Sequence, residues 1–141
     1  MREIKKSVIK EIGKQIAIGN TCYLQRYTGK VTIIDNSTED IKLIAAQEQT
    51  LLELERKMEN YVKIEKPSIE NRLAIMKDFL DELPDKSVRK QLSNALKRNN
   101  PVRNFKKTIE SDIELTQHWS NFKVKEYQQW VSNCIIDAYN Y

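Results

Sequence analysis

The apolar positions of the chain recur mostly at helical spacing, and this pattern predicts about six helices. The first helix is expected from about Glu3 to Ala17, with Gly19 ending it. A second helix is expected to follow, with Ser37 or Thr38 as its N-cap and its end near Asn60. Two acids in its first turn would suit the positive end of the helix dipole.

Four more helices are predicted in the second half of the chain, most of them begun by a polar cap. Ser68 is expected to cap the third helix, which ends at Pro84 because proline disfavours the α region in the residue before it. Asp85 or Ser87 is expected to begin the fourth helix. Asp112 is expected to cap the sixth, which is long and carries one broad apolar face.

A tight corner is predicted between the fourth and fifth helices. Pro101 pushes its predecessor out of the α region, so the fourth helix stops at Asn99 and Asn100. Asn100 is then expected to cap the fifth helix, with Pro101 at the first position, where its missing N–H costs nothing. The fifth helix would turn Phe105 and Ile109 inward and its cations outward.

The segment from Thr21 to Asp35 is rich in strand-forming residues and predicts a β-hairpin. We prefer a three-residue turn with Gly29 in the left-handed region, because a two-residue turn would force Thr28 to positive φ. This turn places Tyr23, Gln25, Val31 and Ile33 on one face, and Cys22, Leu24, Thr32 and Ile34 on the other. A one-residue slip would exchange the faces of one strand relative to the other. Residues Tyr61–Glu65 are expected to add a third strand.

Together these elements predict an α+β fold, mostly helical, with about six helices and a small antiparallel two- or three-stranded sheet near the N-terminus. With 141 residues and only three glycines and three prolines, the chain is expected to form a single domain, residues 1–141. Three aromatic residues of the final helix are predicted to be buried against the helix that carries Met76 and Phe79: Trp119, Phe122 and Trp130.

Positive charge is concentrated in one part of the chain. The formal net charge is +4, yet the block from Lys86 to Ile109 holds eight cations and no acid, so the rest of the chain sums to −4. The cations nearest the corner form the candidate site for an anion or for nucleic-acid phosphates: Lys97, Arg98, Arg103, Lys106 and Lys107. The competing interpretation is a solvated face balanced by the acids of Glu53–Glu59 and Asp78–Glu82.

Other chemistries find little support in the sequence. Cys22 and Cys134 lie far apart and form no CxxC motif, which argues against a disulfide framework and a thiolate metal site. The one histidine, His118, has no partner at metal-ligand spacing, and no Gly-rich loop follows a strand. We therefore expect no catalytic residue, no metal and no cofactor. The N-terminus has no signal-peptide pattern and no apolar run approaches about 20 residues, so we expect a cytoplasmic location and no membrane.

Several short motifs resemble a known family. In the C-terminal half they are Ile75-Met76-Lys77-Asp78-Phe79, Ala95-Leu96-Lys97-Arg98, Pro101-Val102-Arg103-Asn104-Phe105-Lys106, Glu114-Leu115 and Trp119-x-x-Phe122. In the hairpin they are Tyr23-Leu24 and Thr28-Gly29-Lys30-Val31. These motifs are similar to those of small bacterial proteins catalogued only as uncharacterised protein family zero-one-five-eight. The resemblance implies the fold and a bacterial cytosolic setting, and it carries no activity, cofactor or catalytic residue. Val102 departs from the pattern, because an aromatic residue is more usual there.

The favoured hypothesis is a non-catalytic interaction module that binds another macromolecule, either protein or nucleic acid. A protein partner would be met by an exposed apolar patch, expected from Tyr23, Tyr27, Tyr139 or Tyr141. The alternative is nucleic-acid or anion binding through the block Lys86–Lys107, helped by the free N–H groups at the start of the fifth helix. In the competing interpretation, Arg103 lies inward, pairs with Asp112 or Glu114 and binds no anion. An enzyme of unknown type is the third alternative, and the oligomeric state is not predicted.

Overall fold

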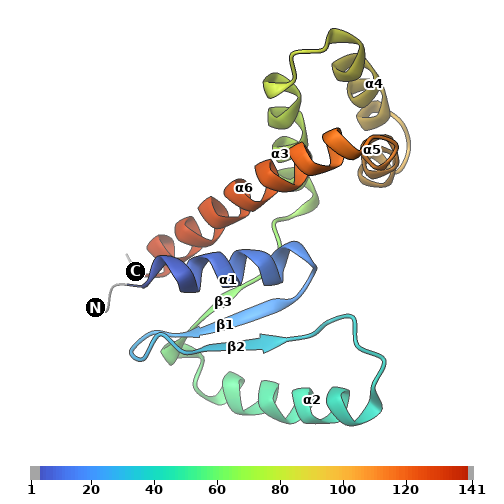
Figure 1. Cartoon of the computed structure of the whole chain (residues 1–141). Coiled ribbons are helices and arrows are strands. Elements are labelled where there is room, and N and C mark those ends of the chain that lie inside the picture. The colour runs from blue at the N-terminus through green and yellow to red at the C-terminus, as the bar shows by residue number, and fades with distance from the viewer. Residues whose placement is uncertain (1–3, 140–141) are drawn as a thin grey trace. The chain divides into compact units, whose positions relative to one another are not determined.

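The computed structural model describes residues 4–139, which form two compact units (Figure 1). Residues 4–66 and 127–139 form the first, which we call the sheet unit, and residues 67–126 form the second, the helical unit. The described residues form six α-helices and a three-stranded antiparallel sheet, so the predicted α+β fold is confirmed. The single domain over residues 1–141 stays a prediction.

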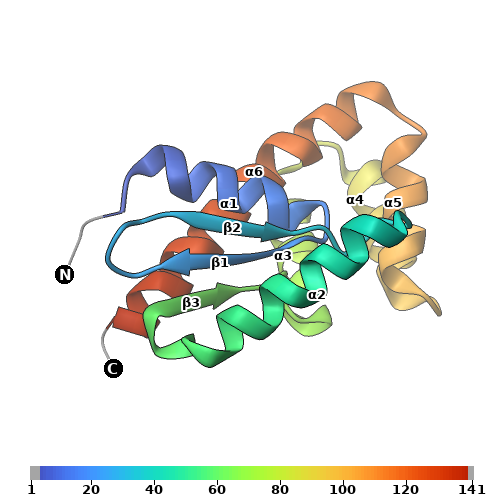
Figure 2. The same ribbon diagram turned by 90° about the horizontal axis from the view of Figure 1, so that it is seen from below.

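The sheet unit places a helix on each face of a small sheet. Its elements are α1 (Lys6–Ala17), β1 (Thr21–Gln25), β2 (Val31–Ile34), α2 (Ile41–Arg56), a single 3-10 turn (Met58–Asn60) and β3 (Tyr61–Ile64). The strand order is β2-β1-β3, so β1 is central and antiparallel to both neighbours. Helix α1 lies on one face of the sheet and α2 on the other (Figures 1 and 2). Strand β3 confirms the third strand predicted at Tyr61–Glu65.

The hairpin turn differs from the prediction by one residue. Gln25 and Lys30 are joined by a backbone hydrogen bond of 2.9 Å, so the loop has four residues rather than three. The Gln25 side chain holds this longer loop, because its Oε1 accepts from the backbone N–H groups of Tyr27 and Thr28 at 2.6 and 2.7 Å. Gly29 has a φ of +74°, as predicted for the left-handed region.

The extra loop residue exchanges the predicted faces of β2. Tyr23 pairs with Thr32 and Cys22 with Ile33, so the predicted grouping of Tyr23 with Val31 and Ile33 is wrong. Tyr23 instead shares its face with Ile34, and both pack against Leu54 of α2. By the alternation of side chains along a strand, the fully buried Cys22 belongs to the face of α1.

One helix cap in the sheet unit was mispredicted, that of α2. Helix α1 begins at Lys6, and the expected start at Glu3 lies outside the described residues. Helix α2 is capped by Asp40, whose carboxylate accepts from the N–H groups of Lys42 and Leu43 at 2.9 and 3.4 Å. The cap is therefore Asp40 and neither Ser37 nor Thr38, because Asp40 stands directly before the first helical residue, Ile41.

The final helix, α6 (Ile113–Tyr139), contributes its last part to the sheet unit. There Arg26 donates from Nη1 to the carbonyl of Ala138 at 3.1 Å. The Trp130 indole N–H donates to the carbonyl of Glu65 at 3.0 Å. Trp130 is only partly buried and belongs to this unit, so its predicted burial against the helix of Met76 and Phe79 is wrong.

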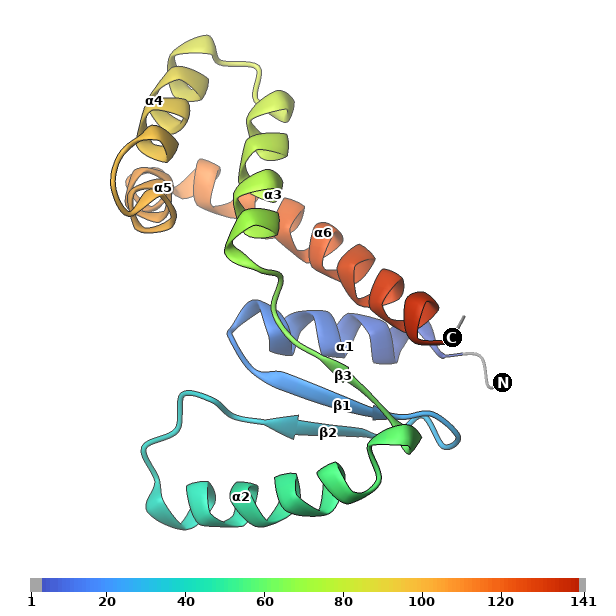
Figure 3. The ribbon, with the colours of Figure 1, turned by 180° about the vertical axis from the view of Figure 1, so that it is seen from behind.

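The helical unit is built around one phenylalanine. It contains α3 (Ile69–Glu82), α4 (Lys86–Lys97), α5 (Pro101–Glu110) and the first part of α6 (Figure 3). Phe79 is fully buried, and its ring centroid lies 6.4 Å from Phe105, 5.1 Å from Trp119 and 5.3 Å from Phe122. The predicted burial of Trp119 and Phe122 is confirmed. Most of these pairs are edge-on, the arrangement that suits the quadrupoles of aromatic rings.

Three of the predicted caps in this unit are confirmed. Ser68 accepts from the N–H of Asn71 at 3.2 Å, and Asp85 accepts from Ser87 at 2.8 Å. Asp112 accepts from Glu114 at 2.9 Å at the start of α6. Each cap stands directly before its helix, so the turns of the helical unit follow from short-range sequence.

Candidate functional site

The corner between α4 and α5 is formed by Arg98, Asn99 and Asn100. Asn100 has φ +57° and ψ +58°, the left-handed conformation that asparagine tolerates better than most residues. The Asn104 side chain ties the corner down, because its Nδ2 donates to the carbonyl of Asn99 at 2.7 Å. This fixed turn carries the chain directly from the end of one cationic helix into the next.

The start of α5 departs from the predicted cap. Pro101 occupies the first turn as expected, but the Asn100 side chain accepts no hydrogen bond from the helix. A capping side chain normally needs extended backbone at the cap residue, and Asn100 is left-handed instead. The first-turn N–H groups of Val102 and Arg103 therefore gain no bond from this residue.

The five predicted site residues, which we call the basic corner, are all exposed: Lys97, Arg98, Arg103, Lys106 and Lys107. Four of them line two surface hollows. One hollow, of about 310 Å³, holds Arg98 and Lys107 among the neutral side chains of Gln91, Asn94, Asn104 and Thr108. The other, of about 570 Å³, holds Arg103, Lys106 and Lys107 beside Ile69, Val102 and the acid Glu110. Lys107 lines both hollows, and Lys97 lines neither.

Carboxylates do not pair with the basic corner. Within residues 4–139, the ion pairs join Lys63 to Glu65 at 3.3 Å and His118 to Glu82 at 3.5 Å. Neither pair includes a cation of the block from Lys86 to Lys107. Arg103 is exposed and forms an ion pair with neither Asp112 nor Glu114, so the predicted alternative of an inward Arg103 is wrong.

Two further cations in the helical unit were not singled out from the sequence. Lys123 on α6 is partly buried, and burial lowers its pKa, with Lys106 and then Arg72 as the further causes. The Nε of Arg72 on α3 is buried without a hydrogen-bond partner in the described residues. Both residues adjoin an apolar stripe, since Leu73 follows Arg72 and Phe122 precedes Lys123. That adjacency is the sequence signal that could have found them.

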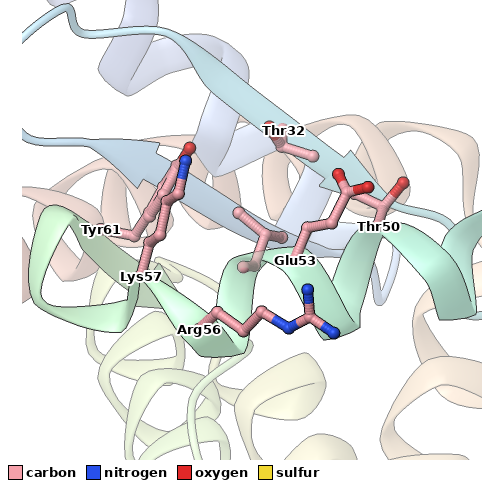
Figure 4. Close-up of a pocket in the computed structure, with 7 residues that line it drawn as sticks. Thr32, Thr50, Glu53, Arg56, Lys57 and Tyr61 are labelled. Carbon is pink, nitrogen blue, oxygen red and sulfur yellow. The ribbon is translucent and has the colours of Figure 1, made fainter.

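The sheet unit offers a hollow of a different kind, between α2 and the sheet. It has about 350 Å³ and is lined by Thr32, Thr50, Glu53, Leu54, Arg56, Lys57 and Tyr61. Figure 4 shows the Glu53 carboxylate turned toward Thr50 and the Arg56 guanidinium turned away from it. Acid and base share this hollow, so its charge does not favour one sign of ligand.

The remaining side chains with reactive groups are Cys22, Cys134 and His118. Cys22 is fully buried, and burial, followed by the Glu11 carboxylate, raises its pKa to about 11, so its thiol is not an activated nucleophile. Burial first and Asp137 second also raise the pKa of Cys134. His118 lies edge-on to Phe79, with ring centroids 5.0 Å apart. In residues 4–139, no three His, Cys, Asp or Glu side chains gather in a group able to hold a metal ion.

The helices of residues 4–139 also lack the combination of length and apolar sequence needed to cross a membrane.

Comparison with known proteins identifies relatives of the chain. Residues 4–138 match the model of a family described as "Uncharacterised protein family (UPF0158)". The chain is 30% identical over 115 residues to the UPF0158 protein PA5073 of Pseudomonas aeruginosa, an alignment that covers 82% of this chain and 71% of that protein. No solved structure matches the chain.

Proposed function

The chain belongs to the uncharacterised protein family UPF0158, and from that premise we propose that it is a non-catalytic interaction module that binds nucleic acid through the basic corner. The observation that carries the proposal is the absence of any ion-pair partner, within residues 4–139, for the cations of the block Lys86–Lys107. Exposed cations that are not neutralised by neighbouring acids attract a polyanion and release its counterions on binding.

The geometry of the two hollows supports a phosphate backbone as the partner. Lys107 lines both, so anions seated in the two hollows would share one cation, as successive phosphates on one strand could. The first hollow adds amide and hydroxyl groups from Asn94, Asn104 and Thr108, which can donate to phosphate oxygens. Phosphate contacts of this kind position a strand without reading its sequence, so binding is expected to be weakly sequence-dependent.

Salt dependence provides a quantitative expectation. If all five cations of the basic corner contact phosphates of a duplex, the logarithm of the affinity falls with the logarithm of salt concentration with a slope of about −4.5. Single-stranded nucleic acid gives a slope of about −3.5 for the same five contacts. A slope near zero would mean that the corner does not bind phosphates.

The test is a titration of single-stranded and duplex oligonucleotides against wild type and the variant Arg98→Glu, Arg103→Glu, Lys107→Glu. A matched control reverses three exposed lysines of the sheet unit, Lys10→Glu, Lys30→Glu and Lys57→Glu, and so changes the net charge equally. We expect the corner variant to lose binding and the control to keep most of it. Circular dichroism confirms that both variants are folded.

Two outcomes would overturn the proposal: equal binding by wild type and the corner variant, or no binding by wild type at low salt. A protein partner would then be the better explanation. The exposed apolar side chains of α2, Ile41, Leu43 and Leu52, would be the surface to test first. Tyr23, predicted for such a patch, is buried, whereas Tyr27 is exposed, Tyr139 is partly buried and Tyr141 lies outside the described residues.

A further inference from the structure

We propose that the larger of the two hollows in the helical unit seats one unstacked base of a single strand, whose phosphates contact the cations of the basic corner. The inference deepens the proposed function and rests on it, because this hollow also holds Arg103, Lys106 and Lys107. It names single-stranded nucleic acid as the ligand and adds a base contact to the phosphate contacts.

The larger hollow has an apolar part that phosphate contacts leave unused. Ile69 of α3 lines it together with Pro101 and Val102 of α5, and its volume is about 570 Å³, within the range of small-molecule sites in proteins. Ile69 is 53% exposed, whereas Val102 packs against the aromatic core of the helical unit. The hollow therefore offers an apolar surface that is fixed from below by the core, and a ligand that covers it would remove apolar area from water.

Helical spacing places cations beside this apolar surface. Lys106 follows Val102 by four positions on α5, so the apolar stem of the lysine lies one turn along from the valine. We call Ile69, Val102 and this stem the base seat. Lys107 follows Arg103 by the same four positions, and these two cations form a second row next to the seat. Because Lys107 also lines the smaller hollow, a strand with a base in the seat can continue its phosphates into that hollow.

The charge of the larger hollow favours a nucleotide over an apolar segment of a protein. Three cations and one acid line it, and none of the four takes part in the ion pairs of residues 4–139. An apolar peptide side chain would cover the base seat but would leave the excess of positive charge unopposed. A nucleotide unit carries both a flat base that stacks on side chains and an anionic phosphate, so it matches both parts of the hollow.

The base seat selects single strands over duplexes. In a duplex every base is stacked and paired, and extruding one costs the free energy of unstacking and unpairing. The bases of a single strand are free to lie on side chains, which is how proteins that bind single strands hold them. We therefore expect single strands to bind more tightly than duplexes of the same sequence, although the duplex has the higher charge density.

Glu110 gives the base seat a chemical preference. Its carboxylate lines the same hollow and stands four positions beyond Lys106 on α5, at the end of the seat. An ionised carboxylate only accepts hydrogen bonds. Cytosine presents an amino donor where thymine presents an acceptor oxygen, so cytosine suits this end of the seat better. The expected preference for cytosine concerns one position within otherwise weakly sequence-dependent binding.

The first experiment titrates the protein with a single strand and with an abasic strand of the same length, which keeps the phosphates and has no bases. Wild type should bind the base-bearing strand about fivefold more tightly. Ile69→Gln should remove most of that difference, and Ile69→Trp should enlarge it, because a base stacks on the indole. The matched controls are Ile113→Gln and Ile113→Trp, since Ile113 is also the exposed first residue of a helix and lines neither hollow. Both controls should leave the difference unchanged.

The second experiment compares single strands of cytosine with single strands of thymine at one salt concentration. Wild type should bind the cytosine strand more tightly, and Glu110→Ala should remove that preference. The matched control is Glu114→Ala, which removes an exposed acid of α6 that lines neither hollow and changes the net charge equally. The control should keep the preference for cytosine. Equal binding of the two strands by wild type would overturn the role given to Glu110.

The base seat and the proposed function fail in different ways. If wild type binds no oligonucleotide at low salt, the proposed function fails and the seat fails with it. If oligonucleotides bind but the abasic strand binds as tightly as the base-bearing strand, the base seat is overturned and the basic corner stands. The same conclusion follows if Ile69→Gln and Ile113→Gln reduce the difference equally, or if Ile69→Gln weakens duplex binding as much as single-strand binding.

Discussion

In the helical unit, α3 buries Met76 to 4% exposure, whereas in the sheet unit the apolar stripe of α2 leaves Ile41 at 81%. The difference lies in what each helix packs against. Helix α3 meets the aromatic side chains of α5 and α6, while α2 covers a sheet of four- and five-residue strands through Leu54 and its neighbours. An apolar stripe thus predicts a helix, but the partner surface determines how much of the stripe is buried.

Charge divides the two units in the same way. The hollow of the sheet unit mixes Glu53 with Arg56 and Lys57, so opposite charges lie within one site. The first hollow of the helical unit has Arg98 and Lys107 and no acid. The stability of the helical unit therefore rests on its aromatic core and not on ion pairs around its cations, and this leaves those cations available to a partner.

The largest expected effect is the loss of the helical core. Phe79→Ala should lower the free energy of unfolding by about 3–5 kcal/mol, because the cavity removes contacts with three aromatic rings. Urea denaturation followed by the fluorescence of Trp119, in a Trp130→Phe background, would measure it. Leu52→Ala on α2 is the control, and its half-exposed side chain should cost less than about 0.5 kcal/mol. Equal costs would contradict the contrast between the units.

The second effect concerns alkaline pH, where one residue of each unit should change the free energy of unfolding in opposite directions. In the sheet unit the pKa of Cys22 is raised from 9.0 to about 11, so its neutral thiol stabilises the fold fully below pH 9. That contribution, about 2–3 kcal/mol on full titration, is lost as pH rises toward 11. Cys22→Ala should therefore flatten the alkaline fall in stability relative to wild type. Identical pH profiles in urea denaturation would show that the thiol is not protected.

As pH rises, Lys123 in the helical unit should change the free energy of unfolding in the opposite direction to Cys22. Its pKa is lowered by burial and then by Lys106 and Arg72, so the unfolded chain holds the proton more tightly than the folded one. Stability from this residue rises as pH increases through the lowered pKa. Lys123→Met should remove this burial penalty at pH 7, and the effect should shrink as pH rises through the lowered pKa toward 10.5.

A smaller effect tests the attachment of α6 to the sheet unit. Trp130→Phe removes the indole N–H that donates to the Glu65 carbonyl and should cost about 1 kcal/mol. Trp130 is only partly buried, so the cost should stay well below that of Phe79→Ala. Thermal unfolding of both variants gives the comparison directly. A cost of 3 kcal/mol or more would mean that Trp130 is a core residue after all.

The smallest effect should be stabilising. Gly13 lies inside α1, and a Cβ there would stand 3.4 Å from the Cγ of Gln128, an ordinary contact. Gly13→Ala should therefore gain about 0.5–1 kcal/mol through the higher helix propensity of alanine. Its melting temperature should rise by a few degrees, about 2–4 °C. A fall would indicate that α1 and α6 pack more closely than this contact implies.

The sequence predicted what short-range chemistry decides. Ser68 and Asp112 were identified as caps, and Asp85 as one of two candidates with Ser87, because each stands before an apolar stripe. The register of the hairpin was not predicted correctly, because it depends on the hydrogen bonds that the Gln25 side chain accepts from the loop, which is one residue longer than expected.

The candidate site likewise has a part that the sequence predicted and a part that only the fold reveals. The basic corner was visible as a run of cations in the sequence, whereas Lys123 comes within electrostatic range of Lys106 and of Arg72, which is 51 residues away, only through helix packing. No periodicity in a single helix predicts such a meeting. The contacts of a folded core are needed to find it.

The sheet unit is discontinuous in sequence, and this has a consequence for how the protein folds during synthesis. Residues 67–126 form the helical unit from one contiguous segment, so it can fold as soon as that segment has left the ribosome. The sheet unit must wait longer, because Arg26 meets the carbonyl of Ala138, which is 112 positions away. Until then α1 and the three strands lack the packing of the last part of α6. Nascent chains stalled between residues 126 and 139 should therefore be the species that most require a chaperone.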